Sequence, residues 1–191
     1  MSSVRRLHRF TYSDYVEVER QSPTKHEFLD GEIYAMAGGS EEHSALSAEC
    51  LRVLGNAVAG RKCRVHTSDL RIYVEAVGLA TFPDGAVICG SMEQHGSSPK
   101  ATALNPMVLL EVTSDSSEEY DKVDKLHYYR TIPARREYIV ISHRERRITV
   151  HSRTTLDEWT TRVAIPGGRV TVESLGAALI GDEIYRDSAI G

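Results

Sequence analysis

Four charged residues stand where chemistry on phosphate esters could occur. Asp84 opens one apolar run, Glu111 lies near the end of another, and Lys122 and Lys125 follow in a segment with helical spacing. Carboxylate oxygens are hard ligands that suit Mg²⁺ or Mn²⁺, and such a metal polarises a phosphate and lowers the pKa of a bound water. A lysine can orient that water or offset developing negative charge. These residues therefore predict metal-assisted hydrolysis of phosphodiester bonds.

The candidate residues also have a purely structural interpretation, and two further residues, Glu27 and His43, are considered in the same way. Asp84 follows a proline, and Pro-Asp is common in turns. Glu111 is either a metal ligand, because a buried carboxylate needs a partner, or a surface residue at a strand end. Glu27 is either a solvated strand residue or a third carboxylate that supports the metal or a water. His43 is expected on the polar surface of a helix.

The lysine is open between two candidates. Asp121, Lys125 and Tyr129 are spaced four residues apart, which places them on one helix face. The structural interpretation is an exposed ion pair between Asp121 and Lys125, worth about 0.3–0.5 kcal/mol. The functional interpretation turns Lys125 toward the end of the strand that carries Glu111. Lys122, a short step along the helix, is the competing candidate.

Composition indicates one globular domain over residues 1–191. Hydrophobic residues make up 41% and charged residues 26% of the chain, and no apolar run reaches the roughly 18 residues that cross a bilayer. The net charge of −4 does not favour nucleic-acid binding, so attraction must come from local arginines or a bound metal. The chain has three cysteines, Cys50, Cys63 and Cys89, and they are widely spaced. An odd number at this spacing argues against a disulfide framework and against a zinc site. It predicts a protein of the reducing cytoplasm.

The hydrophobic pattern predicts helices alternating with strands around a central sheet. An Asp-Gly pair at Asp30 predicts a hairpin, Ser40 is a helix cap, and Ser116 with Glu119 matches a capping box. The predicted helices cover 11–19, 41–58, about 116–130 and 175–179. The predicted strands cover 64–66, 70–74, 81–89, 107–112, 138–141, 148–150 and 159–165, with a loop at 90–105. The fold class is mixed α/β.

Several longer motifs together resemble a known family. The chain is similar, from about residue 11 to residue 141, to a large bacterial family called domain of unknown function 820, or Uma-two, described as restriction-endonuclease-like. The motifs that carry the resemblance are "TKHEFLDGEIYAMAGGS", "CRVHTSDLRIYV", "FPDGAVI", "LLEVTS" and "YDKVDKLHYYRTIPARREYIVIS".

The resemblance implies the PD-(D/E)XK nuclease fold, in which helices flank a mixed sheet and extra antiparallel strands follow. It also implies roles for four residues. Asp84 corresponds to the acid of the Pro-Asp motif and Glu111 to the second acid, and Glu27 corresponds to the acid of the first helix and hairpin. Lys125 corresponds to the family's lysine, which is displaced onto the following helix.

The chain departs from the superfamily pattern at three positions. Thr113 stands where the lysine of the (D/E)XK element would be. Gly85 replaces the apolar residue that usually follows Pro-Asp, and Asp115 stands where the family usually has proline. None of these changes removes a predicted metal ligand.

Two kinds of function follow from this reading. The first is a Mg²⁺- or Mn²⁺-dependent endonuclease that acts on nucleic acid, with DNA as the expected substrate and a homodimer as the expected assembly, by analogy with small nucleases that cut two strands. The second is a non-catalytic binding or assembly module in which the acids form a structural ion-pair cluster. Hydrolysis of a small phosphate or nucleotide is a third possibility without a motif of its own.

Overall fold

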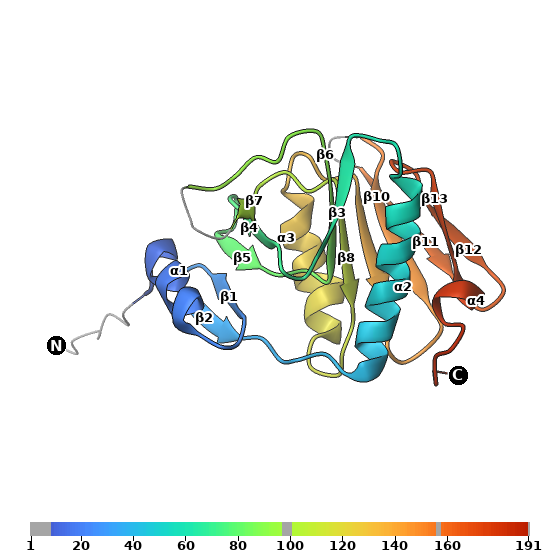
Figure 1. Cartoon of the computed structure of the whole chain (residues 1–191), viewed down its shortest axis with the longest axis horizontal. Coiled ribbons are helices and arrows are strands. Elements are labelled where there is room, and N and C mark those ends of the chain that lie inside the picture. The colour runs from blue at the N-terminus through green and yellow to red at the C-terminus, as the bar shows by residue number, and fades with distance from the viewer. Residues whose placement is uncertain (1–8, 97–100, 156–157, 191) are drawn as a thin grey trace.

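The computed structural model describes residues 9–96, 101–155 and 158–190, and its strands form two main sheets and a small hairpin (Figure 1). The larger sheet has the strand order β11-β10-β9-β8-β6-β3. Its strands are β3 (Cys63–Thr67), β6 (Gly85–Cys89), β8 (Val108–Val112), β9 (Glu137–Ile141), β10 (Ile148–Arg153) and β11 (Trp159–Ala164). Among the described strands of this larger sheet, β8 and β9 run parallel and every other neighbouring pair is antiparallel.

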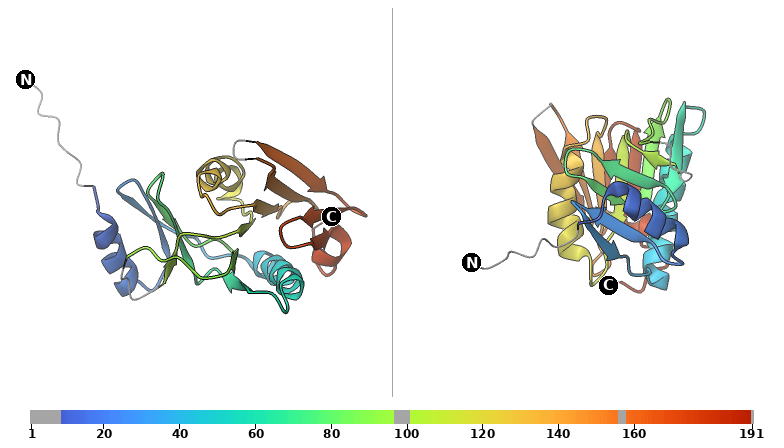
Figure 2. Two further views of the ribbon diagram at one scale, coloured as in Figure 1. Left: turned by 90° about the horizontal axis from the view of Figure 1, so that it is seen from above. Right: turned by 90° about the vertical axis from the view of Figure 1, so that its left-hand side faces the viewer.

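Two helices cover opposite faces of this larger sheet (Figure 2). On one face lies α2 (Glu41–Ala57), joined by the hairpin β12 (Arg169–Val172) and β13 (Ala177–Ile180) and by α4 (Gly181–Ile184). On the other face lies a helix that begins with π-helical turns, η1 (Tyr120–Lys125), and continues as α3 (Leu126–Arg130). Alternate residues of β8 enter the two cores, because successive strand side chains point to opposite faces.

The second sheet carries the N-terminal part of the chain. Its strand order is β2-β1-β5-β4-β7. The elements are α1 (Tyr12–Gln21), β1 (His26–Leu29), β2 (Glu32–Ala35), β4 (Arg71–Val74), β5 (Leu79–Thr81) and β7 (Thr102–Ala103). Tyr15 of α1 packs on Phe28 of β1, with ring centroids 5.4 Å apart, and this contact fastens the hairpin to the helix.

The predicted turn and cap signals have a clear local basis. Thr11 caps α1 in a capping box with Asp14, and Ser40 caps α2 by accepting the backbone N–H of His43. Asp30 and Gly31 have φ angles of 45° and 93°, which suit a tight two-residue hairpin turn between β1 and β2. The mixed α/β fold class is confirmed, and no helix among the described residues is long and apolar enough to span a membrane.

Three predicted elements are wrong. The single strand at 81–89 is two strands in different sheets, because Pro83 has no N–H to donate and the chain crosses between sheets there. The predicted helix at 175–179 is mostly β13, which pairs with β12 across a turn. The capping box at Ser116 does not form; the residue before η1 is Glu119, whose side chain makes no capping hydrogen bond.

The cysteine prediction is also wrong. Cys63 and Cys89 face each other in the β3–β6 register and form a disulfide. The two cysteines are 26 residues apart in the sequence, so their spacing gives no sign of the pairing, which depends on the register of the folded sheet. Cys50 is a free, buried thiol, as expected of a core residue. Of the loop predicted at 90–105, residues 97–100 lie outside the described ranges, and the rest contains the short strand β7.

Candidate active site

The ends of β6 and β8 bring Asp84 and Glu111 together. The strands are antiparallel, so the residue just before β6 lies beside the C-terminal end of β8. The backbone N–H of Val112 donates to Asp84 Oδ2 at 2.8 Å, and the N–H of Asp84 lies 3.4 Å from Glu111 Oε2. Each carboxylate is therefore fixed by the backbone of the strand that carries the other.

Glu27 reaches the same place from the other sheet. It lies on β1, its side chain is only 10% exposed, and it accepts a hydrogen bond from the Thr81 hydroxyl. The prediction of a solvated strand residue is therefore wrong. β1 also pairs with β5, whose last residue, Thr81, leads through Pro83 to Asp84, so the crossing segment connects the two carboxylate-bearing regions.

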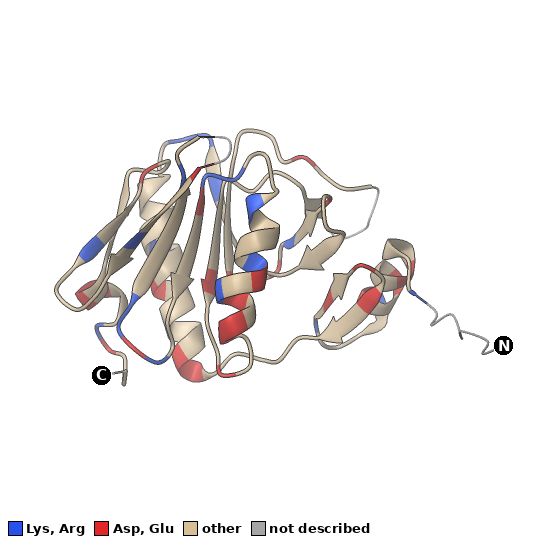
Figure 3. Ribbon diagram, turned by 180° about the vertical axis from the view of Figure 1, so that it is seen from behind, with Lys and Arg blue, Asp and Glu red and all other residues tan. Residues whose placement is uncertain are grey.

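Lys125 lies at the centre of the acidic side chains. Its Nζ is 3.0 Å from Glu111 Oε1, 3.1 Å from Asp121 Oδ1 and 3.3 Å from Glu27 Oε1. The Tyr129 hydroxyl donates to the same Glu111 oxygen at 2.8 Å. The predicted face of Asp121, Lys125 and Tyr129 is thus buried against Glu111, not exposed. Figure 3 shows acidic residues gathered at the N-terminal end of this helix.

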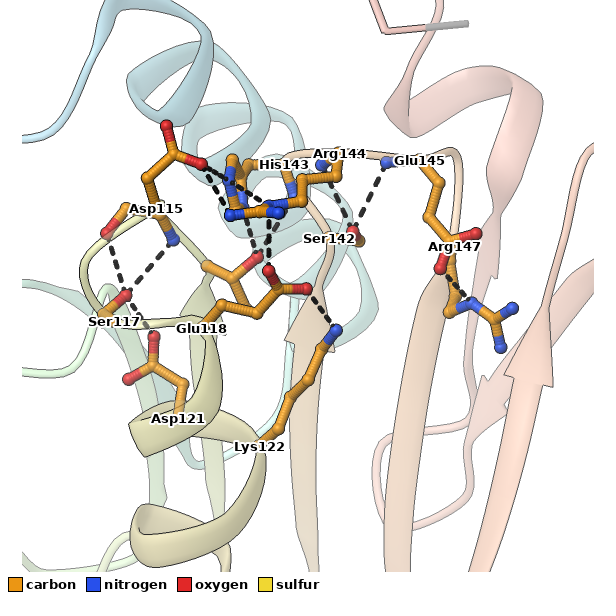
Figure 4. A network of polar contacts seen from close by, with 12 residues as sticks. Asp115, Ser117, Glu118, Asp121, Lys122, Ser142, His143, Arg144, Glu145 and Arg147 are labelled. Carbon is orange, nitrogen blue, oxygen red and sulfur yellow. Dashed lines mark hydrogen bonds and ion pairs between the residues drawn. The ribbon is translucent and has the colours of Figure 1, made fainter.

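Lys122 turns away from the carboxylates. It pairs with Glu118, and its side chain is 41% exposed, against 5% for Lys125. Glu118 also pairs with Arg144 of the β9–β10 turn, at 2.9 Å (Figure 4). The start of η1 is held by Ser117, whose hydroxyl donates to Asp121 Oδ2 at 2.6 Å. Of the two candidate lysines, the fold therefore brings only Lys125 to the site.

His43 is the residue that sequence reasoning undervalued. Its side chain is 18% exposed, and its Nε2 is 3.1 Å from Asp84 Oδ2. It lies in the first turn of α2, and its backbone N–H donates to the side chain of the Ser40 cap. The Gly-Gly-Ser break before the helix signals such a turn, but helical periodicity alone placed His43 on the polar surface.

The departures from the superfamily pattern have local explanations. Thr113 is fully buried, and its hydroxyl lies 2.8 Å from His143 Nδ1. This position therefore links the end of β8 to the β9–β10 turn, and it carries no lysine. Asp115 is exposed and pairs with His143 and Arg144 at 3.0 and 2.8 Å. Gly85 packs so closely that an added Cβ would lie 2.8 Å from a Leu51 methyl.

The electrostatics of the cluster favour an additional cation or proton. The pKa of Glu111 is raised to about 8, chiefly by burial; the charge of Lys125 opposes this shift, and the charges of Asp121 and Asp84 add to it. Burial acts to lower the pKa of Lys125, but the surrounding carboxylates outweigh it and hold that pKa well above its ordinary value. One ammonium therefore does not neutralise the carboxylates around it.

The residues fit a divalent cation in charge and donor type. Three carboxylates (Glu27, Glu111 and Asp121) surround one ammonium, and a fourth, Asp84, lies beside Glu111. Oxygen donors of this kind suit Mg²⁺ or Mn²⁺. Within the described part of the chain, no three His, Cys, Asp or Glu side chains are already grouped as a metal site. Glu27 and Asp121 are directed at Lys125, whereas the Asp84 and Glu111 carboxylates lie next to each other at the ends of β6 and β8. Asp84 and Glu111 are therefore the pair that could hold a metal.

A cavity of about 1090 Å³ opens over these residues. Its floor contains Asp84, Glu111 and Lys125, and its walls come from the β1–β2 hairpin, from the start of α2 and from the η1–α3 helix. All four residues expected at the site, Glu27 included, line this one cavity. The fold thus assembles the predicted set, although their chemical roles stay predictions.

Comparison with known proteins gives consistent matches over most of the chain. A family model described as "Putative restriction endonuclease" matches residues 12–179. Two uncharacterised proteins of Synechocystis are 30% and 34% identical, over 92% and 69% of this chain and 91% and 73% of their own lengths. The crystal structure of "a putative nuclease belonging to DUF820" from Anabaena variabilis shares the fold with a TM-score of 0.70, at 20% identity, covering 90% of this chain and 97% of that one.

Proposed function

The chain belongs to the Uma2 family of restriction-endonuclease-like proteins, and on that premise we propose that it is a Mg²⁺- or Mn²⁺-dependent nuclease that hydrolyses phosphodiester bonds of nucleic acid, with DNA as the substrate. The observation that carries the proposal is the meeting of Asp84, Glu111 and Lys125 on the floor of one cavity. Their types match what hydrolysis of a phosphodiester requires, which is oxygen ligands for a metal and a cation for an attacking water.

Each residue of the site has a distinct part in this proposal. Asp84 and Glu111 would hold the metal, which when bound polarises the phosphate and acidifies water. Glu27 keeps Lys125 in place from the hairpin side, 3.3 Å away. Lys125 Nζ would orient the attacking water beside Glu111. Hydrolysis adds water across one P–O bond and leaves one end as a phosphate and the other as a hydroxyl.

Calorimetric titration with Mn²⁺ tests the metal site directly. The wild type should bind Mn²⁺, and Asp84→Ala and Glu111→Gln should each lose that binding together with metal-dependent cleavage of DNA. Glu173→Gln is the matched control, because this exposed carboxylate on the β12–β13 connection pairs only with Arg162 among its described ion pairs. Cleavage that survives in a folded Asp84→Ala protein would contradict the proposal.

The non-catalytic module makes the opposite prediction. If Lys125 with its three carboxylates is only a structural ion-pair cluster, the wild type binds no Mn²⁺ and cuts no substrate. We include a homodimer in the nuclease proposal, since cutting both strands of a duplex uses two sites. Light scattering of the purified protein measures that assembly independently of activity.

A further inference from the structure

The walls of the cavity differ in character from its floor. The floor is acidic, whereas the upper walls carry aromatic rings, namely Tyr34 on β2, Tyr120 on η1 and Tyr128 on α3. Tyr34 is 49% exposed, which makes it one of the most exposed large apolar side chains among the described residues. Tyr120 and Tyr128 meet edge to face with centroids 6.5 Å apart.

The register of the β1–β2 hairpin pairs a tyrosine with a site carboxylate across the two strands. Glu27 and Tyr34 are cross-strand partners in the β1–β2 pair, so their side chains lie on the same face of the hairpin. The opposite face is occupied, because Phe28 packs on Tyr15 of α1. Tyr34 therefore faces the cavity as a consequence of the same register that buries Glu27.

Among the residues that the structure describes, the cavity lining offers little positive charge to a nucleic-acid backbone. The lysines that line it are Lys25 and Lys125, and both are already paired, Lys25 with Asp69 at 2.9 Å and Lys125 with its carboxylates. Five carboxylates line the same space: Glu27, Asp84, Glu111, Asp121 and Asp124. Duplex binding depends chiefly on cationic contacts with phosphates. Single-strand binding also uses cationic contacts, but it adds stacking of bases against aromatic rings, and the tyrosines of this cavity offer that contribution.

The position of the reactive groups limits what can reach them. The side chains of Glu111 and Lys125 are each 5% exposed, at the bottom of a space that is at the upper end of the range for small-ligand pockets. A paired duplex keeps its base faces stacked inside the helix and presents none of them to the tyrosines. A strand with unstacked bases can offer a base to the wall and a phosphate to the floor together.

We propose that this cavity binds single-stranded nucleic acid, with a base stacked on the wall formed by Tyr34 and Tyr128 and the neighbouring phosphodiester lowered toward Asp84 and Glu111. The inference rests on the proposed function, because it assigns the substrate class of the same site. One site is enough to cut one strand, so this inference does not depend on the homodimer, which light scattering tests separately.

Fluorescence anisotropy with labelled oligothymidine of about ten nucleotides tests the proposal, because aromatic single-strand sites cover about 4–16 nucleotides. The measurement is made in the presence of Ca²⁺. A duplex of the same length and thymidine monophosphate are each added as competitors for the labelled strand. We expect the strand to bind at least about tenfold more tightly than the duplex. Tyr34→Ala and Tyr128→Ala should each weaken strand binding about 5- to 100-fold, the usual effect of removing one stacking ring.

Matched variants separate stacking from other effects. Tyr34→Phe and Tyr128→Phe keep the ring and should bind the strand nearly as the wild type does. Val163→Ala changes an exposed apolar residue on β11, outside the cavity, and should have no effect. The inference is overturned if the duplex binds as tightly as the strand, if the alanine variants bind like the wild type, or if the mononucleotide alone matches the affinity of the strand.

The two proposals fail in different ways. A wild type that binds the strand through its tyrosines but cleaves nothing with Mn²⁺ overturns the nuclease proposal and leaves the binding inference standing. A protein that cleaves duplex DNA and ignores the tyrosine substitutions overturns the binding inference and leaves the nuclease proposal standing.

Discussion

At the scale of single residues, Lys125 determines whether the acidic site can exist without metal. Glu27, Glu111 and Asp121 approach its ammonium within 3.0–3.3 Å from two strands and one helix. These carboxylates are buried, so their mutual repulsion is poorly screened by water. The lysine is therefore a structural counter-ion, whatever else it does in catalysis.

We expect Lys125→Met to lower the free energy of unfolding by about 3–5 kcal/mol in the presence of a chelator, because it leaves buried charges unpaired. Lys122→Met is the matched control, since this exposed lysine lies on the same helix and should change stability by no more than about 0.5 kcal/mol. Urea unfolding followed by circular dichroism measures both. Equal stability of the two variants would show that the carboxylates do not depend on the ammonium.

His151 is a second residue whose charge matters, and it lies away from the site. Its ring stacks on Tyr138, and its Nδ1 is 2.9 Å from the Thr161 hydroxyl. The pKa of His151 is lowered to about 4, chiefly by burial and in addition by the nearby charges of Arg130 and Arg135. The fold therefore holds this imidazole neutral at pH values where the unfolded chain would protonate it.

The sign of the pH effect follows directly. Between the unfolded pKa of about 6.5 and the folded pKa of about 4, the unfolded state binds the extra proton, so stability falls as the pH is lowered through that window. His151→Gln removes the titrating group, and its free energy of unfolding should decline less than that of the wild type between pH 6.5 and 4. Parallel pH profiles for the two proteins would argue against a neutral, partly buried His151.

At the scale of elements, Gly85 sets how closely α2 approaches the larger sheet. A Cβ at this position would lie 2.8 Å from Leu51 Cδ2 on α2 and 3.1 Å from Leu110 Cδ2 on β8. Asp84 precedes it directly, and His43 in the first turn of α2 contacts Asp84 at 3.1 Å. The small residue therefore lets α2 bring its first turn to the acidic site.

Restoring an apolar side chain at this position should separate the two elements. We expect Gly85→Val to lower the free energy of unfolding by about 1–3 kcal/mol through overpacking. Gly55→Ala, within α2 and with open space around its Cβ position, should instead stabilise the protein by about 0.5–1 kcal/mol. Thermal unfolding compares the two, and a Gly85→Val protein as stable as the wild type would show that α2 can move without cost.

At the scale of the whole molecule, the disulfide closes a loop that visits both sheets. The segment from Cys63 to Cys89 runs from β3 through β4 and β5 of the smaller sheet and back to β6 of the larger one. A cross-link limits the freedom of the unfolded chain most when it closes a long loop. The bond therefore restricts the unfolded chain over a segment that supplies strands to both sheets.

Reduction should accordingly destabilise the entire fold. The separation of 26 residues corresponds to a loss of about 3 kcal/mol in the free energy of unfolding, measured by urea unfolding with and without dithiothreitol. The double variant Cys63→Ala/Cys89→Ala should be as unstable as the reduced wild type and should not respond to the reductant. A wild type indifferent to the reductant would contradict this prediction.

Local signals in the sequence predicted the local structure well. The Asp30-Gly31 hairpin, the Ser40 cap and the end of α3 before Pro133 follow from backbone preferences of a few neighbouring residues. The errors occur where distant segments decide. Pro83 separates two strands that belong to different sheets, and the pairing of β12 with β13 makes a strand of a segment with an apparently helical pattern.

By itself, the sequence determined the residue types of the site and their places at element ends, together with the family resemblance that assigned Glu27, Asp84, Glu111 and Lys125 to one set. Only the tertiary structure decided that Asp121 and Lys125 are buried together, that His43 joins Asp84, and that Cys63 meets Cys89. The physical reason is that backbone preferences act between neighbours in the chain, whereas burial, ion pairing and strand register depend on which distant segments the fold brings into contact.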